Sequence, residues 1–432
     1  MLSISYYHFQ IGFWTNSDDN QDHDIDKFFL LHYTHPPSRS SIVMAMKNDG
    51  LSLLELRSRL PDRLFKSSWT HATNILLRDL GMVALFASLA YKGDAFISSY
   101  PLDPTQKTVL RAILWLTYWW FQGLVFTGIW VLGHECGHGS FFPSRTLDDI
   151  VGFMCHTALW TPYFSWKYTH QSHHRHHGSM EKDEHWVPRT RSELNVPEKP
   201  PAHDFFEDTP IITVLRLIVQ QILGLPAYLI LNLSGPVNLP AGTSHFNPYA
   251  VLFKPSQRKH VFISDVGVLV MGYLVYLVTA RLGSSTVMKY YGIPCIAVSH
   301  WVTMIVFLQH TDPELPRYRK KAWNFKMGAL STMDRDFLGW QGQFFLHNVS
   351  HFHTIHHLFP SIPFYHTEEA TDILKAELSE EYHSTSKSVF QSLYDNFRNC
   401  YFVEDEGDIV FYKDRHGRNP ILDTNDELVM RS

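Results

Sequence analysis

Residues 109–138 read VLRAILWLTYWWFQGLVFTGIWVLGHECGH, and this stretch decides the fold. The part 109–132 is almost wholly apolar and rich in tryptophan. A helix needs about 20 such residues to cross the hydrocarbon core of a bilayer. The apolar run leads directly into His134-Glu-Cys-Gly-His138, whose two histidines share a helix face because they are four positions apart. We therefore predict a membrane-spanning helix that carries two imidazoles at its end.

Three further segments have the length and composition of membrane spans: residues 75–96, 261–280 and 290–308. Two other apolar segments are weaker, because residues 211–233 are interrupted by arginine, glutamine and proline and residues 150–164 are short. We expect 211–233 to lie in the interface or against the protein, and 150–164 not to cross. Residues 51–66 form an amphipathic pattern, which predicts a short helix on the membrane surface.

Two more histidine clusters follow, each of the form H-x-x-H-H. They are His170-Gln-Ser-His173-His174 and His353-Thr-Ile-His356-His357. On a helix the first histidine lies on the same side as the fourth and fifth residues, so each cluster presents three imidazoles. Together with the first pair they make eight, which exceeds the four ligands of a tetrahedral zinc and suits two metal ions. The second cluster also fits the register His173, His176 and His177, and spacing alone does not choose between them.

Ligands of one metal site must share one side of the membrane, so the chain must cross it an even number of times between clusters. Two of the three apolar segments between the second and third clusters are therefore expected to cross. Basic residues flank the first and fourth spans: Arg57, Arg59, Arg63 and Lys66 before the first, and Arg317, Arg319, Lys320 and Lys321 after the fourth. The positive-inside rule then places both termini and all three clusters in the cytosol. The four scattered cysteines fit that reducing compartment.

The net charge of −5, with histidine neutral, gives no indication of a nucleic-acid partner. Residues 1–45 contain a polar, acidic stretch without helical period and are expected to be a disordered extension, with Met44 and Met46 as alternative starts. We predict one domain over residues 46–415 and a polar C-terminal tail over residues 416–432.

A different class of protein is a membrane zinc protease, because His134-Glu135-Cys-Gly-His138 matches the H-E-x-x-H motif in which Glu is the general base. This interpretation leaves six histidines unexplained, and the Leu-Asp-Gly sequence of intramembrane proteases is missing downstream. A non-catalytic metal-binding protein is a further alternative. A transporter is disfavoured because only His300 is an ionisable residue in mid-span, and we expect it to be a buried structural histidine. His245 is expected in a loop and not as a ligand.

The clusters and their flanks resemble the membrane-bound fatty acid desaturases, in particular the oleate Δ12 branch of fungi and plants. The resemblance runs from about residue 51 to about residue 412. Besides the clusters it includes Trp166-Lys-Tyr-Thr-His170, Asp183-Glu-His-Trp-Val-Pro188, Leu308-Gln-His310-Thr, Asp334-Arg-Asp336 and His347-Asn348. The Trp166-Lys-Tyr lead-in favours the register that begins at His170 and leaves His176 and His177 as extra histidines.

The resemblance implies a non-haem di-iron centre that activates O₂ and removes two hydrogens from an unactivated acyl chain, with no separate side-chain catalyst. The implied ligands are the eight cluster histidines and a ninth at the end of the fourth span: His134, His138, His170, His173, His174, His310, His353, His356 and His357. A related branch has an Asn four residues before the ninth histidine, where this chain has Val306, so a water-bridged contact is not expected there. Residues expected to orient ligands are His347, Asn348, His351, Asp334 and Asp336.

The resemblance further implies an enzyme of the endoplasmic reticulum membrane that converts oleate to linoleate on a phospholipid or an acyl-CoA. A fused cytochrome b5 domain carries His-Pro-Gly-Gly, which this chain lacks, so electrons are expected from separate cytochrome b5 and its NADH-dependent reductase. Alternatives are an ω3 or bifunctional Δ12/ω3 desaturase, because Gly139-Ser140 resembles the plant ω3 box, or a hydroxylase or acetylenase. The implied fold is all-α: four transmembrane helices, interfacial helices and a cytosolic helical cap holding the histidine-rich di-iron site.

Overall fold

A computed structural model describes residues 51–199, 209–378 and 381–420, and these residues are mostly helical. The predicted extension at residues 1–45 lies outside the described residues, as does the predicted tail beyond residue 420.

Within the described residues, five helices are long and apolar enough to cross a membrane. They are α4 (Trp69–Ser99), α5 (Pro104–His138), α8 (Pro210–Leu231), α9 (Arg258–Leu282) with the short η2 (Pro255–Gln257) before it, and the run Ser284–His310. That run consists of α10 (Ser284–Val287), a π-helical turn η3 (Met288–Gly292) and α11 (Ile293–His310). Four of the five contain the spans predicted from the sequence. The fifth, α8, is the segment that the sequence analysis placed in the interface.

The helices α4 and α5 form a long hairpin, with 31 and 35 residues. At 1.5 Å per residue α5 is about 52 Å long, well above the ~30 Å of a bilayer core. It begins where the Asp103 carboxylate accepts hydrogen bonds from the backbone N–H groups of Thr105 and Gln106, at 2.8 and 3.0 Å. It ends at Gly139, whose φ of +66° is left-handed. A Cβ at Gly139 would lie 1.8 Å from a guanidinium nitrogen of Arg145, so a larger residue would also displace that side chain.

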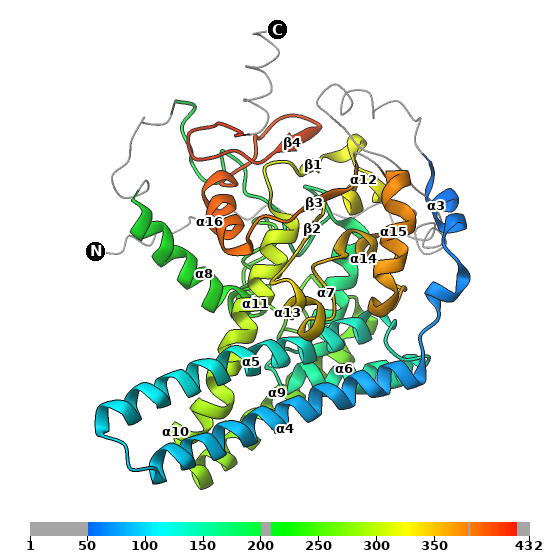
Figure 1. The fold of residues 1–432 in the computed structure, drawn as a ribbon. Coiled ribbons are helices and arrows are strands. Elements are labelled where there is room, and N and C mark those ends of the chain that lie inside the picture. The colour runs from blue at the N-terminus through cyan, green and yellow to red at the C-terminus, as the bar shows by residue number, and fades with distance from the viewer. Residues whose placement is uncertain (1–50, 200–208, 379–380, 421–432) are drawn as a thin grey trace.

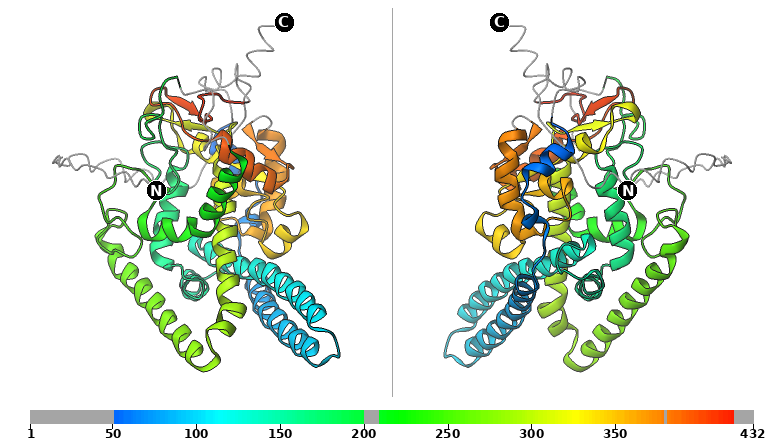
Figure 2. Two further views of the ribbon diagram at one scale, coloured as in Figure 1. Left: turned by 90° about the vertical axis from the view of Figure 1, so that its left-hand side faces the viewer. Right: turned by 90° about the vertical axis from the view of Figure 1, so that its right-hand side faces the viewer.

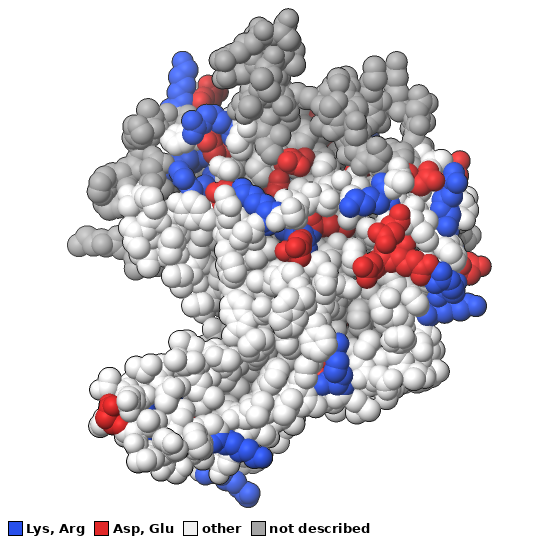
Figure 3. Space-filling view, in the orientation of Figure 1, with Lys and Arg blue, Asp and Glu red and all other residues white. Residues whose placement is uncertain are grey.

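Figure 1 shows α4, α5 and the lower halves of α9 and α11 projecting as a stem from a body of shorter elements. Figure 2 shows the stem helices splayed apart, with the α4–α5 hairpin on one side, α9 on the other and α11 between them. In Figure 3 charged side chains gather over the upper body, and most of the stem surface carries none except near its tip. Large apolar side chains are exposed along the stem, such as Leu85 at 52% and Leu269 at 73%. This is the surface expected of a stem in lipid below a cap in water.

The helix α8 packs on α11, beside its upper part in Figure 1. Gly224 of α8 lies against Thr303 of α11, and Ser299 Oγ donates a 2.7 Å hydrogen bond to the Ile222 carbonyl. Length and composition count α8 among the candidate spans. The rule of even crossings still allows only two of α8, α9 and Ser284–His310 to cross between the second and third clusters.

The cap is built from short helices and two small sheets. Its helices are α3 (Leu53–Arg59), η1 (Asp62–Phe65), α6 (Arg145–Thr157), α7 (Tyr163–His176), η4 (Lys320–Ala322), α12 (Phe325–Leu330), α13 (Trp340–Phe345), α14 (His353–Leu358), η5 (Phe364–His366), α15 (Thr367–Leu378) and α16 (Val389–Asn399). β1 (Pro316–Tyr318) pairs antiparallel with β4 (Ile409–Phe411), and β2 (Met333–Arg335) pairs parallel with β3 (His383–Thr385). As expected, the short segment 150–164 forms no spanning helix.

The amphipathic segment 51–66 differs from its prediction as a membrane-surface helix. It forms α3 and η1, and its leucines Leu56, Leu60 and Leu64 are buried in one apolar cluster with Leu374 and Leu378 of α15. The apolar face therefore packs on the cap, where a helix about 300 residues further along the chain covers it, and is not free to contact lipid.

Candidate metal centre

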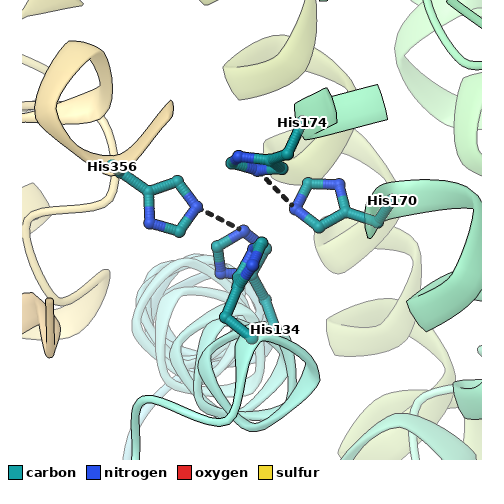
Figure 4. A group of neighbouring side chains, drawn as sticks. His134, His170, His174 and His356 are labelled. Atoms are coloured by element: carbon teal, nitrogen blue, oxygen red, sulfur yellow. Dashed lines mark hydrogen bonds between the residues drawn. The ribbon is translucent and has the colours of Figure 1, made fainter. Parts of the chain in front are cut away.

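The three histidine clusters meet where the stem joins the cap. The first lies on the last turns of α5, the second on α7 and the third on α14, while His310 ends α11. All nine histidines expected as ligands are at most 9% exposed. Figure 4 shows the rings of His134, His170, His174 and His356 directed toward one another from three different helices. The structure thus brings all nine sequence-predicted ligands together.

The ring nitrogens face each other in pairs. The Nε2–Nε2 distance is 3.1 Å for His134 and His356, for His170 and His174, and for His353 and His357, and it is 3.4 Å for His173 and His310. Further ring nitrogens are buried without a hydrogen-bond partner among the described residues: Nε2 of His138 and Nδ1 of His170, His174, His310 and His357. The facing Nε2 atoms offer their lone pairs to a cation that lies between the rings.

The imidazoles fall into two sets. In the first, ring nitrogens of five histidines lie within 4.8 Å of one another: His134, His138, His170, His174 and His356. The second joins two overlapping groups that share His310, one with His173 and His177 and one with His353 and His357. Two such sets can hold two metal ions, and imidazole suits Fe, Zn, Cu and Ni. A single tetrahedral zinc takes four ligands, so the protease interpretation of His134 and His138 does not account for the arrangement.

Burial keeps several of the cluster imidazoles neutral. Desolvation, and then the charge of neighbouring imidazoles, hold the pKa of His170, His174 and His357 well below the ordinary value. The same causes lower the pKa of His356 to about 3. Because a metal ligand must be the neutral imidazole, these rings are ready to bind a cation at neutral pH.

Three of the rings are oriented through their second nitrogen. The Nδ1 atoms of His134, His173 and His353 lie 3.0 Å from the Glu135 carboxylate, the Asp183 carboxylate and the Val349 carbonyl. Metal-binding histidines usually donate their free N–H to such acceptors, which fixes the tautomer and the ring plane. The sequence analysis assigned no such role to Glu135 or Asp183. Glu135 is adjacent to its histidine, and Asp183 lies in the stretch that carried the resemblance, so both were within reach of sequence reasoning.

Asp334, expected to orient a ligating imidazole, instead holds the start of α14. Its Oδ1 accepts hydrogen bonds from the backbone N–H and hydroxyl of Thr354, at 2.7 and 3.0 Å. Its Oδ2 accepts a 2.6 Å hydrogen bond from the Tyr382 hydroxyl. The carboxylate therefore fixes the helix that carries the third cluster. Asp336 pairs at 3.3 Å with His351, and its side chain is 57% exposed.

His347 and Asn348, also expected to orient ligands, form a left-handed pair before the third cluster, with φ of +55° and +61°. The Nε2 atom of His347 lies 2.8 Å from Oδ2 of Asp79, a buried residue of α4. Arg78 also belongs to this group, because its Nε donates a 2.8 Å hydrogen bond to Asp79 Oδ1. The group ties the loop before the third cluster to a stem helix and does not belong to the groups of converging imidazoles.

Four further histidines were named in the sequence analysis, and two of them, His300 and His177, differ from what was expected. His300 is half-buried, and His245 lies in a loop, where its Nε2 is 3.1 Å from the Thr169 hydroxyl. His176 is half-buried, whereas His177 is among the converging imidazoles. Arg317, counted as a basic residue at the membrane surface, is 1% exposed and donates to the His310 carbonyl.

An apolar cavity adjoins the histidines. It has a volume of about 480 Å³, within the usual range for small-molecule sites. Val219 and Leu223 of α8 face Val302, Ile305 and Val306 of α11 across it. Its lining also includes histidines of the clusters, namely His134, His170, His173, His310 and His353. A flexible apolar molecule can therefore approach the converging imidazoles.

The helical stem, the two sets of buried imidazoles and the apolar cavity are features of a membrane protein that can bind metal ions and an apolar molecule. The family model described as fatty acid desaturase matches residues 113–388, and this chain belongs to that family. Members are oxidoreductases with lipid substrates and electron-donor partners. The Δ12 fatty acid desaturases of Mortierella isabellina and Mortierella alpina are 42% and 41% identical to it over 373 residues, covering 84% of this chain and 90% of each relative. The oleoyl-12-hydroxylase of Ricinus communis is 37% identical over 358 residues, covering 82% of this chain and 88% of the relative.

Proposed function

We propose that this chain is an acyl-lipid desaturase that converts oleate to linoleate by inserting a cis double bond at Δ12. In the overall reaction the acyl chain gives up two hydrogens, and O₂ takes these together with two electrons and two protons to form two waters. The observation that carries the proposal is the apolar cavity whose lining includes several of the converging imidazoles. The relatives named Δ12 desaturases supply the position of the double bond.

We infer two iron ions, held by the nine histidines named from the sequence. Bound iron supplies the oxygen chemistry, which no amino-acid side chain performs alone. The protein's own contribution is to keep several of the imidazoles neutral and to orient three of the rings through Glu135, Asp183 and the Val349 carbonyl. The apolar lining of the cavity keeps bulk water from the reacting carbons.

We further propose that cytochrome b5 and its NADH-dependent reductase donate the electrons and that the protein resides in the endoplasmic reticulum membrane. In this proposal the cap and both termini are cytosolic. The exposed basic residues Lys320 and Lys321, just beyond α11, support this orientation by the positive-inside rule. The phospholipid or acyl-CoA head group would then be bound on the cytosolic side.

Expression in a host that makes oleate but no linoleate tests the proposal. We expect linoleate in the lipids of cells with the wild-type chain and none in cells with His173→Ala at equal protein level. A wild-type protein that accumulates in the membrane without any new fatty acid would contradict the proposal. Purified protein should carry about two iron ions per chain, whereas one zinc would favour the protease alternative.

Hydroxylation of oleate is the second candidate, because an oleoyl-12-hydroxylase is among the relatives at 37% identity. It would appear as a hydroxylated product in the same fatty-acid profile. A bifunctional Δ12/ω3 enzyme would give a triene in this host, and a strict ω3 desaturase would give a triene only when linoleate is supplied. The Gly139-Ser140 pair carries little weight for them, because the left-handed φ of +66° at Gly139 by itself favours glycine whatever the substrate.

A further inference from the structure

His177 lies outside the nine inferred ligands, yet it is built into the same site. It follows α7 directly, four residues after His173, and is 1% exposed. Its ring centroid is 4.3 Å from that of His310, 4.7 Å from that of His357 and 4.8 Å from that of His173. A ring nitrogen of His177 lies within 4.8 Å of those of His173 and His310. We propose that His177 is a tenth metal ligand, which binds the metal ion of the second set.

The two nitrogens of His177 have different surroundings. Nε2 donates a 2.9 Å hydrogen bond to the Ser331 carbonyl, which can only accept, so this nitrogen carries a hydrogen. Nδ1 is buried and has no hydrogen-bond partner among the described residues. A ligating imidazole usually shows this division, with one N–H tied to a carbonyl and the other nitrogen free for the metal.

The charged group nearest to Nδ1 also favours a bound cation. Oδ2 of Asp183 lies 3.5 Å from it, whereas a charge-assisted N–H to carboxylate hydrogen bond is usually about 2.7–2.9 Å long. A nitrogen lone pair and a carboxylate oxygen that face each other repel, and a metal ion beside them removes the repulsion. The same carboxylate also accepts from His173, so Asp183 lies between two imidazoles of the second set.

The backbone around His177 holds the ring in place. The His177 carbonyl accepts a 3.0 Å hydrogen bond from Nε1 of Trp323. A Cβ at Gly328 would lie 2.0 Å from that carbonyl oxygen, so α12 packs directly on the turn after α7. The next residue, Gly178, has a left-handed φ of +76°. A ring held this firmly is pre-organised for a ligand.

The number of imidazoles in each set also favours His177 as a ligand. Of the nine inferred ligands, the first set takes five, which leaves four for the second: His173, His310, His353 and His357. With His177 both sets have five imidazoles. The proposal rests on the proposed metal-dependent function, although its test does not require activity.

The variant His177→Gln tests the proposal, because its amide nitrogen can take the place of Nε2 and donate to the Ser331 carbonyl, while the side chain offers no atom in place of Nδ1. The full-length protein is purified in detergent, loaded with Fe²⁺, and assayed for iron per chain and for the rate of iron loss to a chelator. We expect the variant to lose one of two iron ions at least 10-fold faster than the wild type. His176→Gln, on the neighbouring half-buried histidine, is the matched control and should behave as the wild type. Wild-type retention of iron in His177→Gln, with faster loss in His310→Ala, would overturn the proposal.

A measurement on the wild type covers the case in which the variant does not fold. Carbethoxylation of histidines is mapped by mass spectrometry during titration with Fe²⁺. His177 should become protected together with His310, whereas His176 should not. Protection of His310 without protection of His177 would refute the assignment. The linoleate product is measured separately. An inactive wild type in which Fe²⁺ protects His177 contradicts the desaturase proposal alone. An active wild type in which His177 stays unprotected contradicts this inference alone.

Discussion

The crossing of α8 over α11 is close enough that one added methyl group should lower the stability of the protein. A Cβ at Gly224 would lie 2.5 Å from Cγ2 and 2.7 Å from Oγ1 of Thr303. Carbon atoms prefer separations of about 3.5–4.0 Å, so in Gly224→Ala the helices must separate by roughly 1 Å or Thr303 must change rotamer. Overpacking of this kind costs about 1–3 kcal/mol.

The variant Thr303→Ala shows whether this contact is the cause. The Thr303 hydroxyl is buried without a hydrogen-bond partner among the described residues, so its removal breaks no such bond. In the double variant the nearest remaining atom of residue 303, its Cβ, is 3.2 Å from the new methyl group. We therefore expect Gly224→Ala to be much less destabilising in the Thr303→Ala background, with a coupling energy of about 1–2 kcal/mol.

Thermal melting of all four proteins in one detergent measures the effect, and we expect Gly224→Ala alone to lower Tm by a few degrees. Both residues line the cavity, so the fatty-acid profile of the same variants should change as well. Gly81→Ala on α4 is the matched control, because among the described residues no atom beyond its own helix backbone comes within 4 Å of where its Cβ would lie. Additive effects of the two changes, or a Gly224→Ala variant as stable as the wild type, would refute the reasoning.

Three further predictions concern the contacts that hold the cap and the histidines. Asp334→Ala should lower the free energy of unfolding by about 1–3 kcal/mol, because the Thr354 N–H loses its buried acceptor. Asp334→Asn should keep most of the wild-type free energy of unfolding. The Tm of both variants measures the effect. Asp183→Asn should weaken binding of one metal ion by about 10–100-fold in chelator competition, while Glu184→Gln should not. The hydrogen bond from Arg191 is the main cause that lowers the pKa of Glu404 to about 2. A lowered carboxyl pKa stabilises the fold above the unfolded value of 4.5, and this stabilisation is lost as pH falls toward 2. Glu404→Gln should thus lower Tm at pH 6 and converge with the wild type in acid, with an effect of about 1 kcal/mol or less.

Features set by local pattern were predictable from the sequence. The apolar runs gave the positions of four of the five candidate spans, and the spacing of the histidines gave the helices that present them. The segment 211–233 shows the limit of this reasoning. Its Arg216, Gln220 and Gln221 argued against a span, but the sequence did not show that the other side of the helix packs on α11 around Gly224. The residues on which a helix face packs lie elsewhere in the chain, and the composition of the helix does not identify them.

Contacts between distant residues were beyond the sequence analysis for the same reason. The leucines of residues 51–66 looked free for lipid because their partners on α15 come about 300 residues later. His347 was assigned to the metal centre because it precedes the third cluster, but its partner, Asp79, lies on the first long stem helix. His177 was left out of the expected ligands because the resemblance favoured the register that begins at His170. Its place among the imidazoles depends on the turn after α7 and on α12, neither of which follows from the histidine spacing.

The distance along the chain between the paired imidazoles has a consequence for the order of events during protein synthesis. His134 and His356, whose nitrogens are 3.1 Å apart, are separated by 222 residues. A ribosome adding about 5–20 residues per second needs roughly 10–45 s to pass from one to the other. During that interval the nascent chain already exposes the first cluster, and then the second, without the histidines that complete either set. Metal loading is therefore a late step, which follows insertion of the long helices, and a message truncated before α14 yields a membrane protein unable to assemble the centre.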